Sequence, residues 1–581
     1  MEYKLRAEVK NNSSVQLLLA VAVLCGVLAL AFGHMSTAMG ITSLKIAVLS
    51  VFFAGAVLFA FRLPKDVNYE NNLKAVIAFF LFICFEVFAI TGMQKKAFFI
   101  TLCNLLALLV VALYLKKTKQ LTHENMMLII IFASFAIQLG YILETSVVDH
   151  VRQHDVGWFE ENGIGHAGYI EYFLATLRLP SADVLIEKAS GSGISQLYHP
   201  PLHHFLAALW MRAQMMVAIP FWNAVEGIQF LTMFYSTACV IVAKRILEEA
   251  GLEKQSLAFA VALVAFCPVF IIFSGSINND VLSVLFTLSA MLATIKWMKS
   301  DKLVHLLQIA LFIGLGMSTK ASAGIIAVPV ALVMLVKIIK TKEKIKMAGQ
   351  YTLFGAVVFP LGLWWTVRNY MLLKAGPYIP RLSDTNSQYV GFRSLLERYT
   401  PFVGIGRTPY VRFGGEFEYN VWSGLFKSSA FGEFAMFVYS DWAAKFAGVL
   451  FATTVLICIT AFFAMLYSCF FKKNFLKPEK AFMAATYIAV LASYLFFCYQ
   501  FPHTCSMNIR YASPLIIIGA FFLGALIQLL QNEADARQFL PPEETGGRVI
   551  GLRVGTFALK CLIGVYVASS VLVYTLLTIP K

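Results

Sequence analysis

The stretch that decides the fold is residues 144–212, ETSVVDHVRQHDVGWFEENGIGHAGYIEYFLATLRLPSADVLIEKASGSGISQLYHPPLHHFLAALWMR. Nearly all of the chain on either side of it is hydrophobic enough to lie in a lipid bilayer. Ionisable side chains gather in this stretch, which contains six of the ten histidines, His150, His154, His166, His199, His203 and His204. A polar loop between apolar segments is where a membrane protein can bind polar groups, so we expect the functional site here.

Composition places the whole chain in the membrane. Of its 581 residues 59% are hydrophobic and 14% are charged, and the mean hydropathy is +0.73, values that indicate a polytopic membrane protein. The net charge of +15 comes from short loops between apolar runs, as the positive-inside rule expects, so we predict no nucleic-acid partner. No CxxC pair occurs, and a disulfide framework or cysteine zinc site is not expected.

Apolar runs of about 20 residues predict the spans. Four precede the polar stretch and its flanking helix, and we expect an all-α bundle of about 13–15 transmembrane helices. The predicted spans are 14–33, 43–62, 74–93, 97–115, 126–146, 224–246, 256–274, 281–299, 303–319, 322–340, 349–371, 444–470, 480–500, 511–530 and 555–577.

Loop charge predicts the orientation and the domains. Lysine-rich segments such as 337–346 and 472–480 follow even-numbered spans and should face the cytoplasm, which places the long loops 147–223 and 372–443 outside. We expect three parts, listed here: four extra helices over 1–125, a main module over 126–530, and a cytoplasmic loop with a terminal span over 531–581. Within the first outer loop, 166–180 and 200–216 resemble amphipathic helices that lie in the interface with their apolar faces toward lipid.

Asp155 is the first candidate for chemistry. A carboxylate in a partly desolvated outer cavity can act as a general base that takes a proton from a hydroxyl group. Arg152 could hold this carboxylate ionised or bind a phosphate with its planar fork. Asp149 is the alternative base, and a surface ion pair that caps a loop is the plain structural explanation.

The histidines and their neighbours are candidate ligands. His154, His166, Tyr169 and His199 could contact substrate or phosphate, and a divalent metal ion held by Asp155, His166 and His199 is one possibility. The spacing does not match a compact zinc pattern, and interfacial histidines that only bind water and headgroups are the alternative.

Polar residues also stand at the outer ends of later spans. Asn279 and Asp280 either cap the next helix or turn its free amides toward an anion. Lys320, Arg368 and Arg510 occupy similar positions, where snorkelling lysine is the plain explanation. Together with Arg152, these cations at one mouth predict an anionic substrate such as a lipid headgroup.

The order of these motifs resembles bacterial integral-membrane glycosyltransferases of the GT-C superfamily, near family 39 and the protein mannosyltransferase-like group. The resemblance covers roughly 126–530 and is found in RQHD, HPPLHHFLAAL, SINNDVL, GLGMSTKASAGIIAVP, LWWTVRN and IRYASP. The family usually has one span before the acidic loop, so the four leading helices would be an addition.

This resemblance implies a multi-pass enzyme of the cell membrane with its active site on the extracellular face. It would move a sugar, with inversion, from a polyprenyl-phosphate carrier to an acceptor glycan, lipid or protein. Asp155 would be the general base, and basic residues, with or without a metal ion, would stabilise the departing phosphate. The alternatives are a transporter or flippase of lipid-linked sugars, for which no internal repeat is evident, and a sensor or scaffold.

Overall fold

The computed structural model describes most of the chain beyond residue 120. The described residues are 101, 104–105, 108–109, 112–113, 115–117, 119, 121–150, 155–159, 165–185, 196–216, 218–373, 384–406, 408–412, 418–433, 441–472, 474–537 and 542–576. The first three predicted spans and most of the fourth lie outside them.

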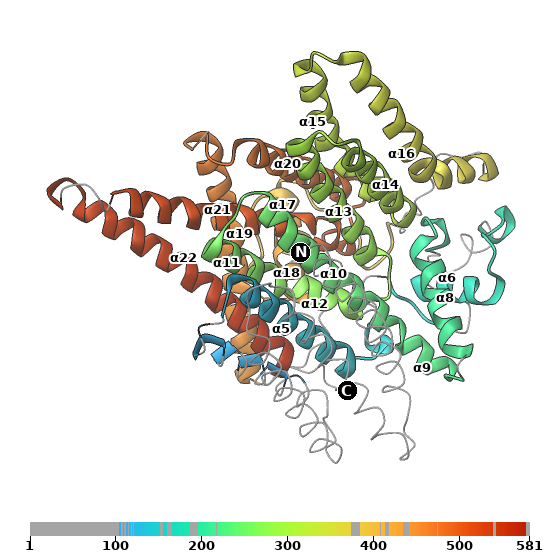
Figure 1. The fold of residues 1–581 in the computed structure, drawn as a ribbon. Coiled ribbons are helices and arrows are strands. Elements are labelled where there is room, and N and C mark those ends of the chain that lie inside the picture. Colours follow the sequence, from blue (N-terminus) through green and yellow to red (C-terminus); the bar gives the residue numbers. More distant parts are fainter. Residues whose placement is uncertain are drawn as a thin grey trace, which may run out of the picture.

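The described part is helical, as predicted, and its extended contacts are isolated bridges such as Tyr389–His503. Figure 1 shows the helices packed as one bundle. They are α5 (His123–Glu144), α6 (Gly165–Thr176), α8 (Leu202–Met216), α9 (Phe221–Glu226), α10 (Ile228–Glu249), α11 (Lys254–Ala265), α12 (Pro268–Gly275), α13 (Asp280–Ser300), α14 (Leu303–Thr319), α15 (Ala327–Lys340), α16 (Lys344–Leu373), α17 (Leu395–Tyr399), α18 (Val421–Phe431), α19 (Asp441–Phe470), α20 (Lys477–Gln500), α21 (Pro514–Arg537) and α22 (Pro542–Leu576).

The helices match the spans predicted from residue 126 onward. Among the described residues, nine helices are long and apolar enough to cross a membrane, and α11 with α12 forms a further span bent by 40°. The remaining predicted span, α14, is apolar but shorter, at 17 residues. The all-helical polytopic fold is therefore confirmed.

The bent span is stabilised by hydroxyl groups from other helices. Pro268 begins α12, and proline supplies no backbone N–H, so carbonyls before the break lose their helical partners. Ser134 of α5 donates to the Ala265 carbonyl at 2.5 Å, and Ser570 of α22 donates to the Phe266 carbonyl at 2.6 Å. Such donors make a broken helix tolerable in an apolar environment.

A second, smaller apolar core lies beside the main one. Tyr169 and Phe173 of α6 pack with Ala207 and Met211 of α8 in this core, and Figure 1 shows the two helices side by side at one edge of the bundle. The prediction that both helices turn their apolar faces to lipid is therefore wrong for the buried faces. Each helix instead buries its apolar stripe against the other, because helix–helix contact removes the same surface from water.

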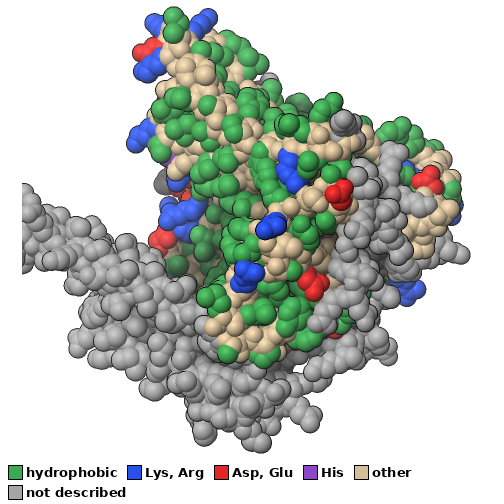
Figure 2. All heavy atoms as spheres, turned by 90° about the vertical axis from the view of Figure 1, so that its right-hand side faces the viewer, with side chains coloured by type: hydrophobic (Ala, Val, Ile, Leu, Met, Phe, Trp, Pro, Cys, Tyr) green, Lys and Arg blue, Asp and Glu red, His purple; other side chains and the backbone are tan. Residues whose placement is uncertain are grey.

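The α15–α16 pair is poorly buried. The α16 helix buries 11% of its most apolar 18-residue window inside the protein, against 67% for α13. Figure 2 shows hydrophobic side chains over most of the described part of one face, and charged side chains at the tip where α15 and α16 meet. An apolar surface with a charged tip is what a lipid-facing helix pair requires.

The long loop between α16 and α19 packs on the turn between α20 and α21. The Val390 N–H donates to the Pro502 carbonyl, and the Thr504 N–H donates to the Gln388 carbonyl, both at 2.9 Å. This pairing fixes the turn that contains Arg510.

Candidate functional site

Arg510 lies at the centre of the site. It belongs to a single 3-10 turn, Ile509–Tyr511, in which the Asn508 side-chain oxygen accepts the Arg510 N–H at 2.9 Å. The Ile509 N–H donates to Ser428 Oγ of α18 at 2.9 Å. These bonds leave the guanidinium buried, with 1% of the side chain exposed.

Three carboxylates surround this guanidinium. Asp155 Oδ2 lies 2.8 Å from Arg510 Nη2, Glu433 Oε2 lies 3.6 Å from the same nitrogen, and Asp280 Oδ2 lies 3.6 Å from Nη1. Lys320 forms an ion pair with the other oxygen of Asp280. We call these five residues the charge cluster. Buried charges are stable only when they are paired, and here three separate segments supply partners for Arg510.

Asp155 differs from the other two carboxylates in its exposure. Its side chain is 40% exposed, whereas those of Asp280 and Glu433 are 2% and 3% exposed. Asp155 has a left-handed backbone conformation (φ 58°), and its carbonyl accepts the His166 N–H at the start of α6 at 3.0 Å. The start of α6 thus holds the one carboxylate of the cluster that an external molecule can reach.

Asparagines order the start of α13. The Asn278 amide donates to Asp280 Oδ2 at 2.8 Å, and its oxygen accepts the Asp280 N–H at 3.0 Å. Asn279 donates to the Thr319 carbonyl at 2.9 Å and makes no side-chain cap on α13. The expected capping by Asn279 is therefore replaced by a tie between α13 and the end of α14, which carries Lys320.

The two cations of the cluster share one aromatic ring. Lys320 Nζ lies 4.8 Å, and Arg510 Cζ 4.7 Å, from the centroid of Tyr511. Burial lowers the pKa of Lys320, and the neighbouring Asp280 raises it in opposition. The ring face therefore contributes to holding two like charges close together.

The predicted histidines form a stack beside the cluster. His166 Nδ1 and His204 Nε2 are 2.8 Å apart with parallel rings, and His199 stacks on His166 with centroids 5.4 Å apart. His203 Nε2 donates to the Ile277 carbonyl at 2.8 Å. Burial lowers the pKa of all four imidazoles, to about 4 for His203, so the stack is neutral at pH 7.

The proposed metal set does not form among the described residues. No group of three His, Cys, Asp or Glu side chains there is arranged to hold a metal ion. His166 is bonded to His204, and the nearest charged partner of Asp155 is Arg510.

The remaining predicted residues have other positions. Asp149 accepts the Ser146 N–H at 2.8 Å in an exposed turn. Arg368 stacks over Trp365 and donates to the Pro180 carbonyl, and Tyr169 OH donates to the His199 carbonyl at 3.2 Å. Arg152 and His154 lie outside the described residues.

Glu433 is the member of the cluster that sequence analysis did not predict. It follows α18 in the second outer loop, and no motif or periodicity marks it. Its one local signal is the preceding Gly432, whose φ of 76° is favourable for glycine and turns the chain at the end of the helix.

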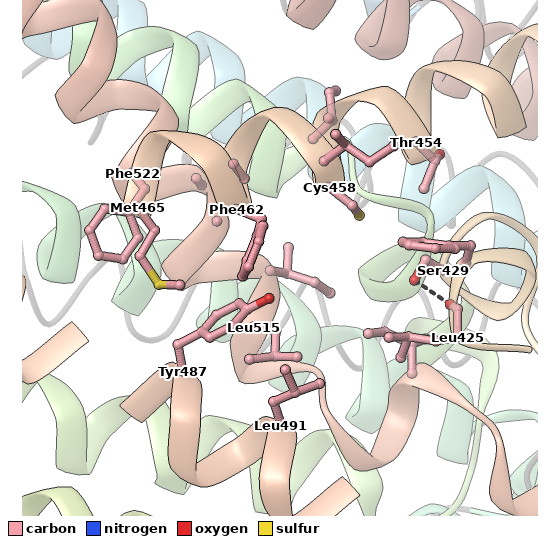
Figure 3. A pocket seen from close by; sticks show the side chains of 18 of the residues that line it. Leu425, Ser429, Thr454, Cys458, Phe462, Met465, Tyr487, Leu491, Leu515 and Phe522 are labelled. Atoms are coloured by element: carbon pink, nitrogen blue, oxygen red, sulfur yellow. Dashed lines mark hydrogen bonds between the residues drawn. The ribbon is translucent and has the colours of Figure 1, made fainter. Parts of the chain in front are cut away.

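An apolar pocket of about 430 Å³ opens next to the cluster. Figure 3 shows its walls, formed by α18, α19, α20 and α21. Ile509, the neighbour of Arg510 in the chain, lines it together with Phe462 and Leu491. Even the Ser429 hydroxyl in its wall is turned to the Leu425 carbonyl, at 2.7 Å. The pocket therefore suits a hydrocarbon chain.

Fold and site together define a polytopic helical membrane protein with a buried charge cluster beside an apolar pocket. Residues 198–365 match the family model described as dolichyl-phosphate-mannose-protein mannosyltransferase, and the resemblance predicted from the motifs is confirmed over this segment. The segment contains Asp280 and Lys320 but not Asp155, Glu433 or Arg510.

No curated protein sequence matches the chain. Two solved structures are similar in arrangement. ArnT from Cupriavidus metallidurans bound to undecaprenyl phosphate aligns with a TM-score of 0.40 and 9% identity, over 77% of this chain and 76% of that one. The Archaeoglobus fulgidus oligosaccharyltransferase in its apo form aligns with a TM-score of 0.39 and 11% identity, over 78% and 56%. We draw no functional conclusion from alignments at this level.

Proposed function

We propose that the protein is a membrane glycosyltransferase that moves a sugar from a polyprenyl-phosphate carrier to an acceptor hydroxyl, with inversion, on the outer face of the cell membrane. The observation that supports this most directly is Asp155, a partly exposed carboxylate held by a buried arginine beside an apolar pocket. The match of residues 198–365 to the mannosyltransferase model supports the reaction class.

Asp155 acts as the general base. It takes the proton of the acceptor hydroxyl while the hydroxyl oxygen attacks the anomeric carbon and the bond from that carbon to the phosphate oxygen breaks. Because attack comes from the face opposite the leaving group, the configuration inverts. The products are the glycosylated acceptor and free polyprenyl phosphate. The transferred group is a hexose or a pentose, and the acceptor is a glycan, a lipid or a protein.

Our candidate for the cation that holds the leaving phosphate is Arg368, which has no carboxylate partner among the described residues. Lys320 and Arg510 are already neutralised by carboxylates, whereas Arg368 forms no ion pair with a described residue and bonds only to a carbonyl and to Asn369. A cation aimed at the departing anion lowers the barrier. No step is assigned to a metal ion, because the described residues offer no set of ligands for one.

The apolar pocket accommodates the polyprenyl chain. Three of its walls, α19, α20 and α21, are helices long and apolar enough to span the membrane, so a carrier could enter from the bilayer with its phosphate at the level of Arg510. The charge cluster lies at the ends of α13 and α14 opposite to Lys299 and Lys302, which the positive-inside rule places in the cytoplasm, and this supports an outer-face site.

The test is transfer by the purified protein in detergent with a panel of polyprenyl-phosphate sugars. Release of polyprenyl phosphate by the wild type and not by Asp155→Asn is expected. Asp149→Asn is the matched control, because it removes a charge from the same loop away from the cluster, and it should retain activity. If Asp149→Asn loses transfer activity and Asp155→Asn retains it, the general base is Asp149. Movement of lipid-linked sugar across proteoliposomes without any product would favour the flippase instead.

A further inference from the structure

The position of Glu433 relates it to the reaction. Its carboxylate shares one nitrogen, Arg510 Nη2, with Asp155, although the two acids come from different outer loops. The residue before it, Gly432, donates its N–H to the Ser428 carbonyl at 3.0 Å, where α18 ends and the chain turns. The Glu433 side chain that follows is 3% exposed and lies against Arg510.

The charge cluster has one negative charge in excess. Asp155, Asp280 and Glu433 carry three negative charges, and Lys320 and Arg510 carry two positive ones. Among the described residues, the other ionisable groups that face the cluster are neutral at pH 7. Burial raises the pKa of Tyr198, Tyr511 and Cys505 and lowers that of His199.

We propose that Glu433 is a positioning residue for the transfer reaction, which keeps Arg510 electrically compensated when Asp155 accepts the acceptor proton. This inference rests on the proposed function. When the proton moves from the hydroxyl to Asp155, the net charge of the cluster goes from −1 to zero. With glutamine at position 433 the same step would go from zero to +1, and a buried unpaired positive charge is costly.

Glu433 also keeps Arg510 in position when Asp155 is protonated. Its 3.6 Å separation from Nη2 is longer than a hydrogen bond, so this nitrogen bonds Asp155 at 2.8 Å in the resting state. As Asp155 becomes neutral, the hydrogen bond shifts in favour of Glu433, which remains charged. Arg510 therefore stays in place through the step.

The test compares Glu433→Gln, Glu433→Asp and Glu418→Gln with the wild type. Glu418 is the matched control, because it is an equally buried glutamate, 2.8 Å from Lys427, in the same outer loop. Glu433→Gln should lower kcat about 100-fold, change the donor KM by less than about threefold, and move the acidic limb of the pH–rate profile to lower pH. Glu433→Asp should recover at least a tenth of the wild-type kcat.

Glu418→Gln should lose thermal stability but keep kcat within about threefold, with an unchanged profile. The inference is overturned if Glu433→Gln keeps its kcat and profile, or if Glu418→Gln loses as much kcat as Glu433→Gln. A donor KM near the wild-type value shows that the variant is folded, and if Glu433→Gln does not fold, Glu433→Asp decides by its kcat and profile. If the wild type transfers no sugar from any donor, the proposed function fails and this inference fails with it.

Discussion

Two groups of buried charges differ in a way that distinguishes a chemical role from a structural one. Glu418 and Lys427 form a closed pair with 6% and 0% of their side chains exposed, and the charges cancel. The charge cluster does not cancel, and one of its carboxylates, Asp155, is 40% exposed. A balanced, closed pair can hold a loop in place, whereas an unbalanced cluster open on one side can exchange a proton.

Removal of Arg510 should have the largest effect on this comparison. Arg510→Met leaves three carboxylates close together with only Lys320, so we expect loss of transfer by about 1,000-fold and a loss of stability of about 3–5 kcal/mol. Transfer rate and thermal midpoint in detergent measure both. Arg510→Lys keeps the charge without the planar fork and should be intermediate; a Met variant within tenfold of wild type would contradict a central role for Arg510.

The closed pair should behave as a structural element. Lys427→Met alone strands the buried Glu418 carboxylate and should cost about 3–5 kcal/mol, whereas Lys427→Met combined with Glu418→Leu should recover most of that loss. Thermal unfolding measures the change, and kcat of the folded fraction should stay within about threefold. If the double variant folds well but its kcat falls, the Glu418–Lys427 pair contributes to the reaction, and the distinction between the pair and the charge cluster is wrong.

The histidine stack predicts how the stability of the protein depends on pH. The unfolded state gains protons below pH 6.5, while burial keeps the folded pKa of His203 at about 4 and those of His166 and His204 well below 6.5. Stability is therefore full above pH 6.5 and falls as pH decreases, by at most about 1.4 kcal/mol per histidine per pH unit.

Thermal midpoints measured from pH 7 to pH 5 check this expectation. His203→Asn preserves a donor for the Ile277 carbonyl and cannot titrate. Unfolding of this variant should therefore take up one proton fewer, and its thermal midpoint should fall less steeply as the pH decreases. An identical slope in the variant would show that this histidine takes up protons in the folded protein as it does in the unfolded chain.

The smallest effect concerns neutral hydrogen bonds near and far from the cluster. Asn279→Ala removes the bond to the Thr319 carbonyl next to Lys320, and Ser570→Ala removes the bond at the bent span. Each should cost about 1–2 kcal/mol, because a buried carbonyl loses its donor. Only Asn279→Ala should also lower kcat, by a few fold; equal kcat in both variants would show that the α13–α14 tie does not position Lys320.

Much of this architecture could be predicted from sequence because long apolar runs determine spans. Asp155, Asp280, Lys320 and Arg510 could be selected as candidates because ionisable residues at span ends are costly without a purpose. Their mutual pairing could not be predicted, since loop lengths do not say which carboxylate meets which cation. The sequence therefore suggests a phosphate ligand at Arg510, whereas in the structure three carboxylates surround this side chain.

Other features had no sequence signal. Glu433 is one glutamate in a long loop, and its contact depends on the turn at Gly432 and on the fold of the α20–α21 connection. The pairing of α6 with α8 was also missed, because an amphipathic pattern shows that a helix has an apolar face but not what covers it.

The bent span has a consequence for how the chain is made. The Phe266 carbonyl receives its hydrogen bond from Ser570, 304 residues further along the chain. During synthesis the earlier segment therefore enters the bilayer long before its donor exists, and that carbonyl needs a temporary partner such as water or another polar group. The final geometry of the break is reached only after α22 has been synthesised and has packed, so a chain interrupted before residue 570 would hold this region in an immature form.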